Sequence, residues 1–293
     1  MQRLLIIGSG DVARRALPRL VRRYRVYALL RDRAKAAEWR AAGATPVLAD
    51  LDDRRSLARL AGLADLVLHC APPANAGTVD GRTRRLLAAL GKGKSLPRRL
   101  VYVSTTGVYG DCGGACIDET RAVVPSSARA GRRVDAEARL RAWGRDNGAT
   151  VCLVRAPGIY AADRLPLERL RAGTPALVPA DDVYTNHIHA EDLAAACLAA
   201  LGRGRPNRAY NAVDDTDLTM GAYFDRVADA FALPRPPRIR RAEASGRLTP
   251  LQLSFMAESR RIGNRRLKEE LGVVLAYPTV EAGIAAAIQQ QRI

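Results

Sequence analysis

The chain has 293 residues with hydrophobic and charged fractions of 48% and 26%. These values exclude a disordered protein and allow one large domain, with or without a smaller lobe. The net charge of +17 comes from arginines spread along the chain, so we expect no nucleic-acid partner. The five cysteines lack a metal-site or disulfide spacing, and there is no apolar run of the roughly 18 residues that a membrane helix needs. We therefore expect a cytoplasmic protein without a metal ion or membrane partner.

Short apolar runs alternate with amphipathic patterns in the first 160 residues, which is typical of parallel strands covered by helices. The expected strands are 3–8, 25–30, 45–50, 64–70, 99–105 and 150–157, and the expected helices are 11–23, 33–42, 53–61, 78–91 and 130–147. The pattern predicts an α/β fold with a doubly wound parallel Rossmann sheet. Its strand order should be 3-2-1-4-5-6, with a nucleotide crevice beside the first strand.

The regular alternation ends after residue 157, where Pro and Gly become frequent. We expect 183–213 to add to the Rossmann domain of residues 1–160, with the strand 183–188 reaching the sheet or its edge. The segments 161–182 and 214–293, with helices near 219–232, 263–271 and 278–290, should form a small, mainly helical C-terminal lobe that binds a substrate.

A glycine turn follows the first expected strand in "IIGSGDVA". Gly8 permits the tight turn and Gly10 allows close approach of a pyrophosphate, which then lies at the N-terminus of the next helix. The expected cofactor contacts in this turn are Gly8, Ser9, Gly10, Asp11 and Val12, and Asp11 also fits the role of helix N-cap.

The end of the second strand predicts the choice of cofactor. Folds that bind NAD usually place an acidic residue here to bind the ribose 2′-hydroxyl, but this sequence has Leu30 followed by Arg31. A cation at this point suits the 2′-phosphate of NADP. We therefore expect NADP in preference to NAD, with Asp32 pairing with Arg33 or capping the next helix.

The carboxyl ends of the next two strands supply further candidate contacts. Asp50 and Leu51 follow the third strand, while Cys70, Ala71 and Pro72 follow the fourth. Asp and Pro are also common in plain turns. Their shared position at one edge of a parallel sheet favours a rim that contacts the ligand.

The motif "VYVSTTGVYGD" resembles the extended short-chain dehydrogenase/reductase family, the NAD-dependent epimerase/dehydratase group. The segments "LVRAPGIY" (153–160), "NHIHAEDLAAACLAAL" (186–201) and "YNAVDD" (210–215) extend this resemblance over nearly the whole chain. It implies a Rossmann domain that binds NAD(P), with Pro157 among the cofactor contacts, and a lobe that binds a small molecule, often a nucleotide sugar. It also implies a catalytic hydroxyl at Thr105, with Ser104 beside it.

The chain departs from that family at its proton-transfer pair, a Tyr followed four residues later by a Lys. There is no Tyr from 110 to 159 and no Lys from 95 to 267. With Glu137 matched to the acidic residue of the family helix, the pair falls on Arg129 and Arg133. Arg133 fits the role of the cation, but Arg129 cannot exchange a proton at neutral pH because its pKa is above about 12.

Three accounts of function remain open from the sequence. In the first, Tyr109, Tyr160, Asp111 or His187 supplies the proton; in the second, the reaction needs only the cofactor and an anionic substrate held by Arg129 and Arg133. In the third, the protein is a catalytically silent NADP-binding sensor or partner protein. We favour an epimerase/dehydratase-like oxidoreductase, monomeric or homodimeric, with a substrate that is not identified.

Overall fold

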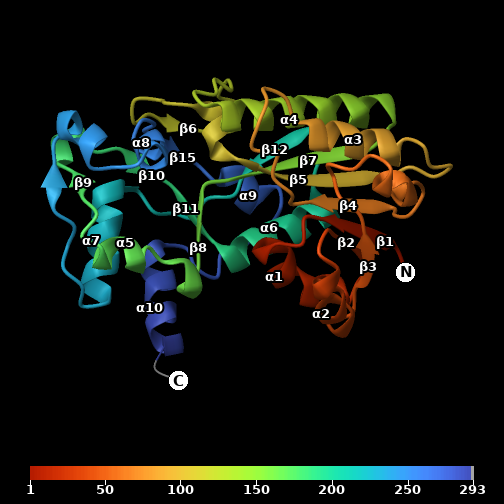
Figure 1. The fold of residues 1–293 in the computed structure, drawn as a ribbon, viewed down its shortest axis with the longest axis horizontal. Coiled ribbons are helices and arrows are strands. Elements are labelled where there is room, and N and C mark those ends of the chain that lie inside the picture. The colour runs from red at the N-terminus through yellow and green to blue at the C-terminus, as the bar shows by residue number, and fades with distance from the viewer. Residues whose placement is uncertain (292–293) are drawn as a thin grey trace.

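The computed structural model describes residues 1–291. A twisted seven-stranded parallel sheet forms one end of the molecule and a lobe of helices and short strand pairs forms the other (Figure 1). The sheet contains β1 (Arg3–Ile7), β2 (Arg25–Leu30), β3 (Thr45–Leu48), β4 (Leu66–His69), β5 (Arg99–Thr105), β7 (Thr150–Ala156) and β12 (Arg208–Asn211). Its order is β12-β7-β5-β4-β1-β2-β3. The predicted order of the first six strands is confirmed, and β12 adds a seventh.

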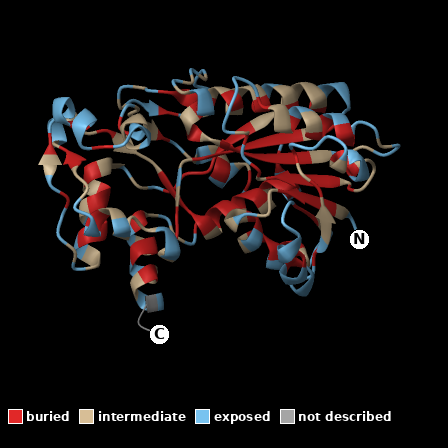
Figure 2. Cartoon of the chain, viewed as in Figure 1, coloured by how far each residue is buried: buried red, intermediate tan, exposed pale blue. Residues whose placement is uncertain are grey.

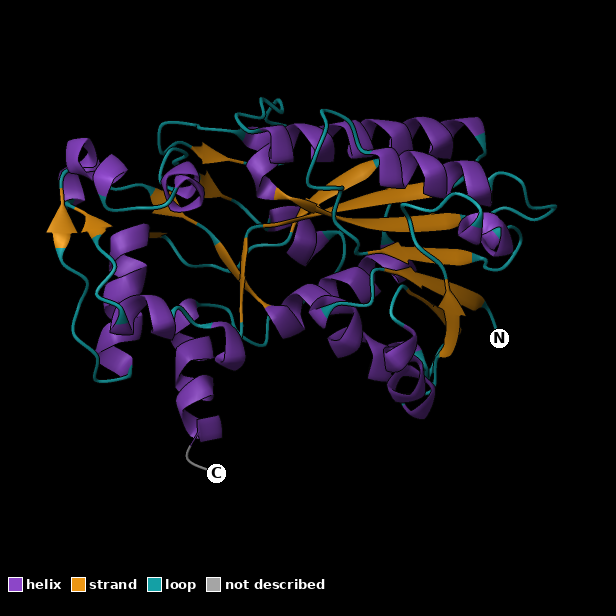
Figure 3. Ribbon diagram, viewed as in Figure 1, coloured by secondary structure: helices purple, strands orange, loops and turns teal. Residues whose placement is uncertain are grey.

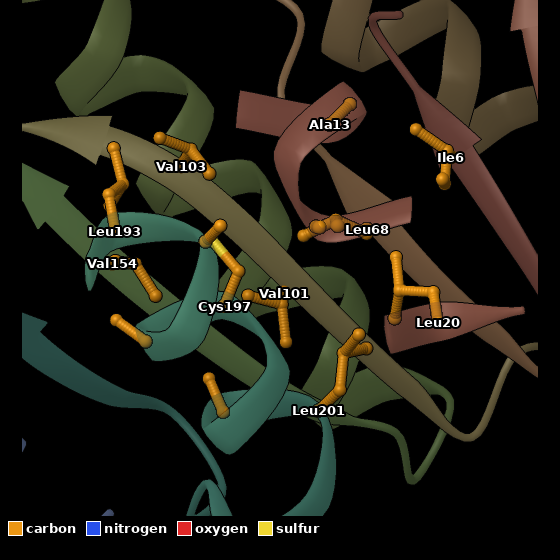
Figure 4. Packing of buried hydrophobic residues seen from close by; sticks show 14 of the residues in the cluster. Ile6, Ala13, Leu20, Leu68, Val101, Val103, Val154, Leu193, Cys197 and Leu201 are labelled. Atoms are coloured by element: carbon orange, nitrogen blue, oxygen red, sulfur yellow. The ribbon is translucent and has the colours of Figure 1, made fainter. Parts of the chain in front are cut away.

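Two layers of helices cover the sheet because successive strand side chains point to opposite faces. One layer holds α1 (Asp11–Leu20), α2 (Ala36–Ala41) and α6 (Ala190–Arg203), and the other holds α3 (Gly81–Leu90) and α4 (Ala128–Asp146). Figure 4 shows how side chains of α1 and α6 meet the first face of the sheet, with Cys197 and Leu193 packed near Val103 and Val154. The central strands β1, β4, β5 and β7 are almost entirely buried (Figure 2), so they form a rigid platform for residues at the carboxyl edge of the sheet.

The lobe combines helices with two-stranded pairs (Figure 3). Its helices are α5 (Leu167–Arg171), α7 (Met220–Ala230), α8 (Pro250–Phe255) and α10 (Val280–Gln291), whereas α9 (Arg265–Glu269) packs beside β12, with Leu267 in the core of the sheet. The short strands form four pairs outside the main sheet: β8 (Gly158–Tyr160) with β11 (His187–His189), β9 (Ala176–Leu177) with β14 (Arg238–Ile239), β10 (Tyr184–Thr185) with β13 (Leu218–Thr219), and β6 (Cys116–Ile117) with β15 (Arg261–Ile262).

The expectation that 183–188 joins the main sheet is wrong. This segment divides into β10 and the start of β11, which pair with β13 and β8. Its place beside β7 is taken by β12, whose register with β7 runs from Arg208 opposite Cys152 to Asn211 opposite Arg155. No helix within residues 1–291 is long and apolar enough to cross a membrane.

Candidate active site

A cleft of about 350 Å³ lies at the carboxyl ends of β1 to β4. Many of the expected cofactor contacts line it, and the set is Gly8, Ser9, Gly10, Arg31, Asp50, Leu51, Cys70, Ala71 and Pro72. Gly8 has a φ of +91°, and a Cβ there would lie 2.4 Å from the backbone nitrogen of Ala71, so only glycine fits between β1 and β4. The sequence thus brings residues from four separate strands to one rim.

The glycine turn is suited to a dinucleotide phosphate. A Cβ on Gly10 would meet no atom within 4 Å, so the space over this turn is open to an approaching group. Gly10 is the N-cap of α1, and no side chain caps the first turn, which leaves its backbone N–H groups available to an anion. These features fit the pyrophosphate of NAD(P).

Asp11 and Val12 do not line this cleft. The expectation that Asp11 caps the helix is wrong, since the helix begins at Asp11 itself and its carboxylate pairs with Arg15 at 2.9 Å and Arg164 at 3.1 Å. Val12 packs half-buried against the core beneath α1.

The end of β2 places two cations at the same cleft. Arg31 and Lys35 both line it and both are exposed. Asp32 accepts a hydrogen bond from the backbone nitrogen of Ala34 at 2.9 Å, so it caps the following turn. The sequence interpretation missed Lys35, which the short turn Arg33–Lys35 brings back to the cleft.

A second cavity, of about 760 Å³, adjoins the cleft at Pro72 and lies between the sheet edge and the lobe. Thr105, Arg129, Arg133 and Pro157 line it. The Thr105 hydroxyl oxygen accepts from the backbone nitrogen of Gly107 at 3.2 Å, which leaves its proton available to a ligand. These four residues come from β5, α4 and the end of β7.

Arg129 and Arg133 differ in how firmly they are held. Arg133 is half-buried and donates through Nη1 to the Tyr102 phenol at 2.9 Å and to the Val103 carbonyl at 2.7 Å. Arg129 is exposed, and its guanidinium lies 4.9 Å from the ring centroid of Phe255 on α8. Both therefore lie against the wall of the cavity, on one face of α4.

Ser104 and Tyr109 do not reach this cavity, which corrects their expected catalytic roles. Ser104 points to the opposite face of β5 from Thr105 and donates to Glu137 Oε1 at 2.6 Å. Tyr109 is 1% exposed, donates to Asn211 Oδ1 at 2.7 Å and accepts from Arg155 at 2.9 Å. Because Arg155 also pairs with Glu137 at 2.7 Å, these residues form one buried network that joins β5, β7 and α4.

Two of the other candidate proton donors are also engaged elsewhere. The Tyr160 hydroxyl donates to the carbonyl of Thr279 at 3.1 Å, and Asp111 accepts from the backbone nitrogens of Gly113 and Ser259. His187 does line the cavity: its ring lies 4.1 Å from the Tyr223 ring, and its Nδ1 is buried without a partner. Burial lowers the pKa of His187 to about 4, so its imidazole is neutral at pH 7.

Arginine dominates the charge of the cavity wall. Six arginines line it, against Glu258 as the one acidic residue: Arg129, Arg132, Arg133, Arg164, Arg169 and Arg260. Arg164 pairs with Asp11 and Arg260 with Glu258. Within residues 1–291, the other four have no carboxylate within 4.0 Å. The Nε atoms of Arg132, Arg169 and Arg260 are also buried without partners, so the wall has an excess of hydrogen-bond donors.

No group of His, Cys, Asp and Glu side chains that could hold a metal ion occurs in the part of the chain that the structure describes. The five cysteines are free thiols, and Cys70 lies at the cleft with its thiol pKa raised by burial to about 12. The site therefore offers hydroxyl, imidazole and guanidinium groups.

Comparisons with known proteins agree with this geometry. The model of a family described as NAD(P)H-binding matches residues 8–203. A conserved protein of unknown function from Silicibacter pomeroyi is 29% identical, with a TM-score of 0.81 over 100% of both chains. A search of curated proteins finds no match.

Two enzyme structures share the fold at lower identity. A dTDP-glucose 4,6-dehydratase from Streptomyces venezuelae, with NAD and DAU bound, is 20% identical with a TM-score of 0.77, over 100% of this chain and 97% of that one. A UDP-glucose 4-epimerase from Thermotoga maritima, with UDP-glucose, is 18% identical with a TM-score of 0.78, over 100% and 99%. The fold of this chain is thus that of epimerases and dehydratases.

Proposed function

Since the chain belongs to the NAD(P)H-binding family, we propose that it is an NADP-dependent oxidoreductase of the epimerase/dehydratase type that acts on a small anionic substrate. The observation that carries the proposal is the large cavity beside the dinucleotide cleft, lined by four arginines without a carboxylate partner. A buried or half-buried guanidinium without a counter-ion gains most from a ligand that brings a negative charge.

The preference for NADP is supported by Arg31 and Lys35, which line the same end of the cleft. Two cations there favour the 2′-phosphate, and the position that usually carries an acidic residue is occupied by Leu30. When bound, NADP supplies the hydride chemistry, and Gly8, Gly10 and the first turn of α1 would hold its phosphates.

Thr105 and Arg133 would orient the substrate. The Thr105 hydroxyl can donate a hydrogen bond to a substrate oxygen, because its own oxygen already accepts a hydrogen bond from the backbone N–H of Gly107. Arg133 is fixed through Nη1, and its remaining N–H groups can bind an oxyanion or a ribose hydroxyl. Neither residue exchanges a proton at neutral pH.

The chain lacks the Tyr and Lys pair that exchanges protons in the extended short-chain dehydrogenase/reductase family. His187 is the titratable group of the cavity wall that keeps an unpartnered ring nitrogen, and its neutral imidazole can accept a proton. Loss of a positioned acid or base lowers rates by roughly 10²- to 10⁴-fold. Because burial lowers the pKa of His187 to about 4, its imidazole is a weak base at neutral pH, and we therefore propose slow turnover.

The alternative is a catalytically silent NADP-binding sensor. A sensor that only binds the dinucleotide needs no second cavity, whereas this protein has a second cavity of about 760 Å³ that Thr105, His187 and six arginines help to line. This space favours the oxidoreductase.

A paired substrate screen tests the proposal. NADPH oxidation is followed by absorbance with carbonyl acids and with their neutral methyl esters. We expect the acids to be turned over or to bind more tightly than the esters. The acids should also raise the melting temperature of the NADP-loaded protein. Arg129→Ala should remove this increase and leave NADP binding intact. Equal results for acids and esters, or an unchanged increase in Arg129→Ala, would contradict an anionic substrate.

A further inference from the structure

The unpartnered arginines of the large cavity lie on two separate parts of the molecule. Arg129, Arg132 and Arg133 lie on α4, which packs on the sheet, at positions i, i+3 and i+4 that share one helix face. Arg169 also lines the cavity and lies on α5, which Figure 1 shows in the lobe, away from α4. One cavity therefore has two positively charged walls.

The lobe wall is built around Arg169. Its guanidinium lies 4.5 Å from the ring centroid of Phe224 and donates to the carbonyl of Pro175 at 2.8 Å. These two contacts fix the orientation of the side chain without neutralising its charge. Its Nε is buried without a partner, and burial lowers its pKa, as expected for a cation that lacks a counter-ion.

The sheet wall contains a second buried cation. Arg132 is 6% exposed and donates to the carbonyl of Gly77 at 2.8 Å, while its Nε has no partner. Each wall thus holds an oriented guanidinium with a carbonyl contact and, within residues 1–291, no carboxylate within 4.0 Å. Two separate anionic groups would each find an oriented guanidinium here, one on α4 and one on α5.

We infer that the substrate carries two acidic groups, one bound by the arginines of α4 and the other by Arg169. This inference rests on the proposed function and adds the class of substrate, a dianion that spans the cavity from sheet to lobe. Bound in this way, the substrate would connect the lobe to the Rossmann domain. Tyr223 and Phe224 on α7, which also line the cavity, would contact the apolar part of the substrate.

Isothermal titration of NADP-loaded protein with simple carboxylates tests the inference. The probes are the dicarboxylates from malonate to adipate, each compared with the monocarboxylate of the same chain length. We expect at least one dicarboxylate to bind about tenfold more tightly than its monocarboxylate, since each charge-assisted contact adds to affinity. Arg169→Gln should remove this preference and leave the monocarboxylate affinity unchanged.

Arg171→Gln is the matched control, because Arg171 lies on the same helix, is exposed and pairs with Glu168 at 2.5 Å. It should keep the full preference for dicarboxylates. Arg169→Lys retains the charge and should keep part of the preference, so it decides the test if Arg169→Gln does not fold.

The outcomes separate the inference from the proposed function. Equal affinity for monocarboxylates and dicarboxylates, or equal losses in Arg169→Gln and Arg171→Gln, would overturn the dianion and leave the anionic site intact. Failure of every carboxylate to bind would overturn both.

Discussion

Arg133 on α4 donates to the phenol oxygen of Tyr102 on β5 at 2.9 Å, with its guanidinium carbon 5.4 Å from the centre of that ring. Tyr102 is fully buried, so it serves as a rigid anchor beneath the side chain. Arg133 is thus firmly held at the wall of the large cavity.

The first prediction concerns this anchored cation. Arg133→Ala should weaken NADP binding by about tenfold, because a charge-assisted donor at the cavity is lost. Calorimetric titration measures the change. Tyr102→Phe is the control: it removes one contact, leaves the Val103 carbonyl to hold Arg133, and should change NADP affinity by less than about threefold. Equal effects of both variants would show that Arg133 does not bind the ligand directly.

The second prediction concerns cofactor choice. Wild-type protein should bind NADP at least about tenfold more tightly than NAD, equivalent to about 1.4 kcal/mol. The double variant Arg31→Gln, Lys35→Gln should lose this preference without weakening NAD binding, since NAD has no 2′-phosphate. A preference for NAD in the wild type would refute the role given to these two cations.

The third prediction concerns the buried ion pair of Glu137 and Arg155, whose side chains are both 3% exposed. Glu137→Gln leaves Arg155 without a counter-ion in the interior and should lower the free energy of unfolding by about 3 kcal/mol, as measured by urea denaturation. Glu168→Gln, in the exposed pair with Arg171, should have no measurable effect. Similar stabilities for the two variants would show that the network does not hold β5, β7 and α4 together.

The fourth prediction concerns pH. The pKa of His187 is about 4 in the folded protein because burial disfavours the charged ring, compared with about 6.5 in an unfolded chain. Below pH 6.5 the unfolded chain binds a proton at His187 that the folded protein does not bind. Protonation of His187 therefore leaves the free energy of unfolding unchanged above pH 6.5 and lowers it as the pH falls toward 4.

Between pH 7 and pH 4, His187→Gln should therefore lose less stability than the wild type, by about 3 kcal/mol. Denaturation curves at several pH values measure this difference. His189→Gln should show a smaller difference in the same direction, because Asp192 and Glu191 partly offset the effect of burial on the pKa of His189. Parallel pH profiles for wild type and His187→Gln would indicate that His187 is solvated in the folded protein.

Most of the Rossmann fold could be predicted because its signals are local. Each buried strand is a short apolar run, and the glycine turn lies between a strand and a helix, so the sheet order and the rim with Gly8 and Pro72 follow from general rules of parallel sheets. The sequence likewise placed Leu30 and Arg31, at the end of β2, beside the cleft.

The rest depended on contacts between distant segments. The alternation of β5 decides that Thr105 faces the cavity while Ser104 faces Glu137, and a strand's facing is fixed only once its neighbours are known. Arg169 belongs to a segment without a motif for ligand binding, and only the packing of the lobe brings it to the cavity. Asp11 has the residue type of a helix cap, but its carboxylate is engaged by Arg15 and Arg164.

A crystal structure of the protein soaked with NADP is the most direct test of the central claim, that the dinucleotide cleft and the arginine-lined cavity form one oxidoreductase site. The account predicts that the phosphates lie on Gly10 and the first turn of α1, and that the nicotinamide C4 faces the cavity between Thr105 and Arg133. A nicotinamide directed away from this cavity, with Arg129 and Arg133 surrounded by solvent, would contradict the account and favour the NADP sensor.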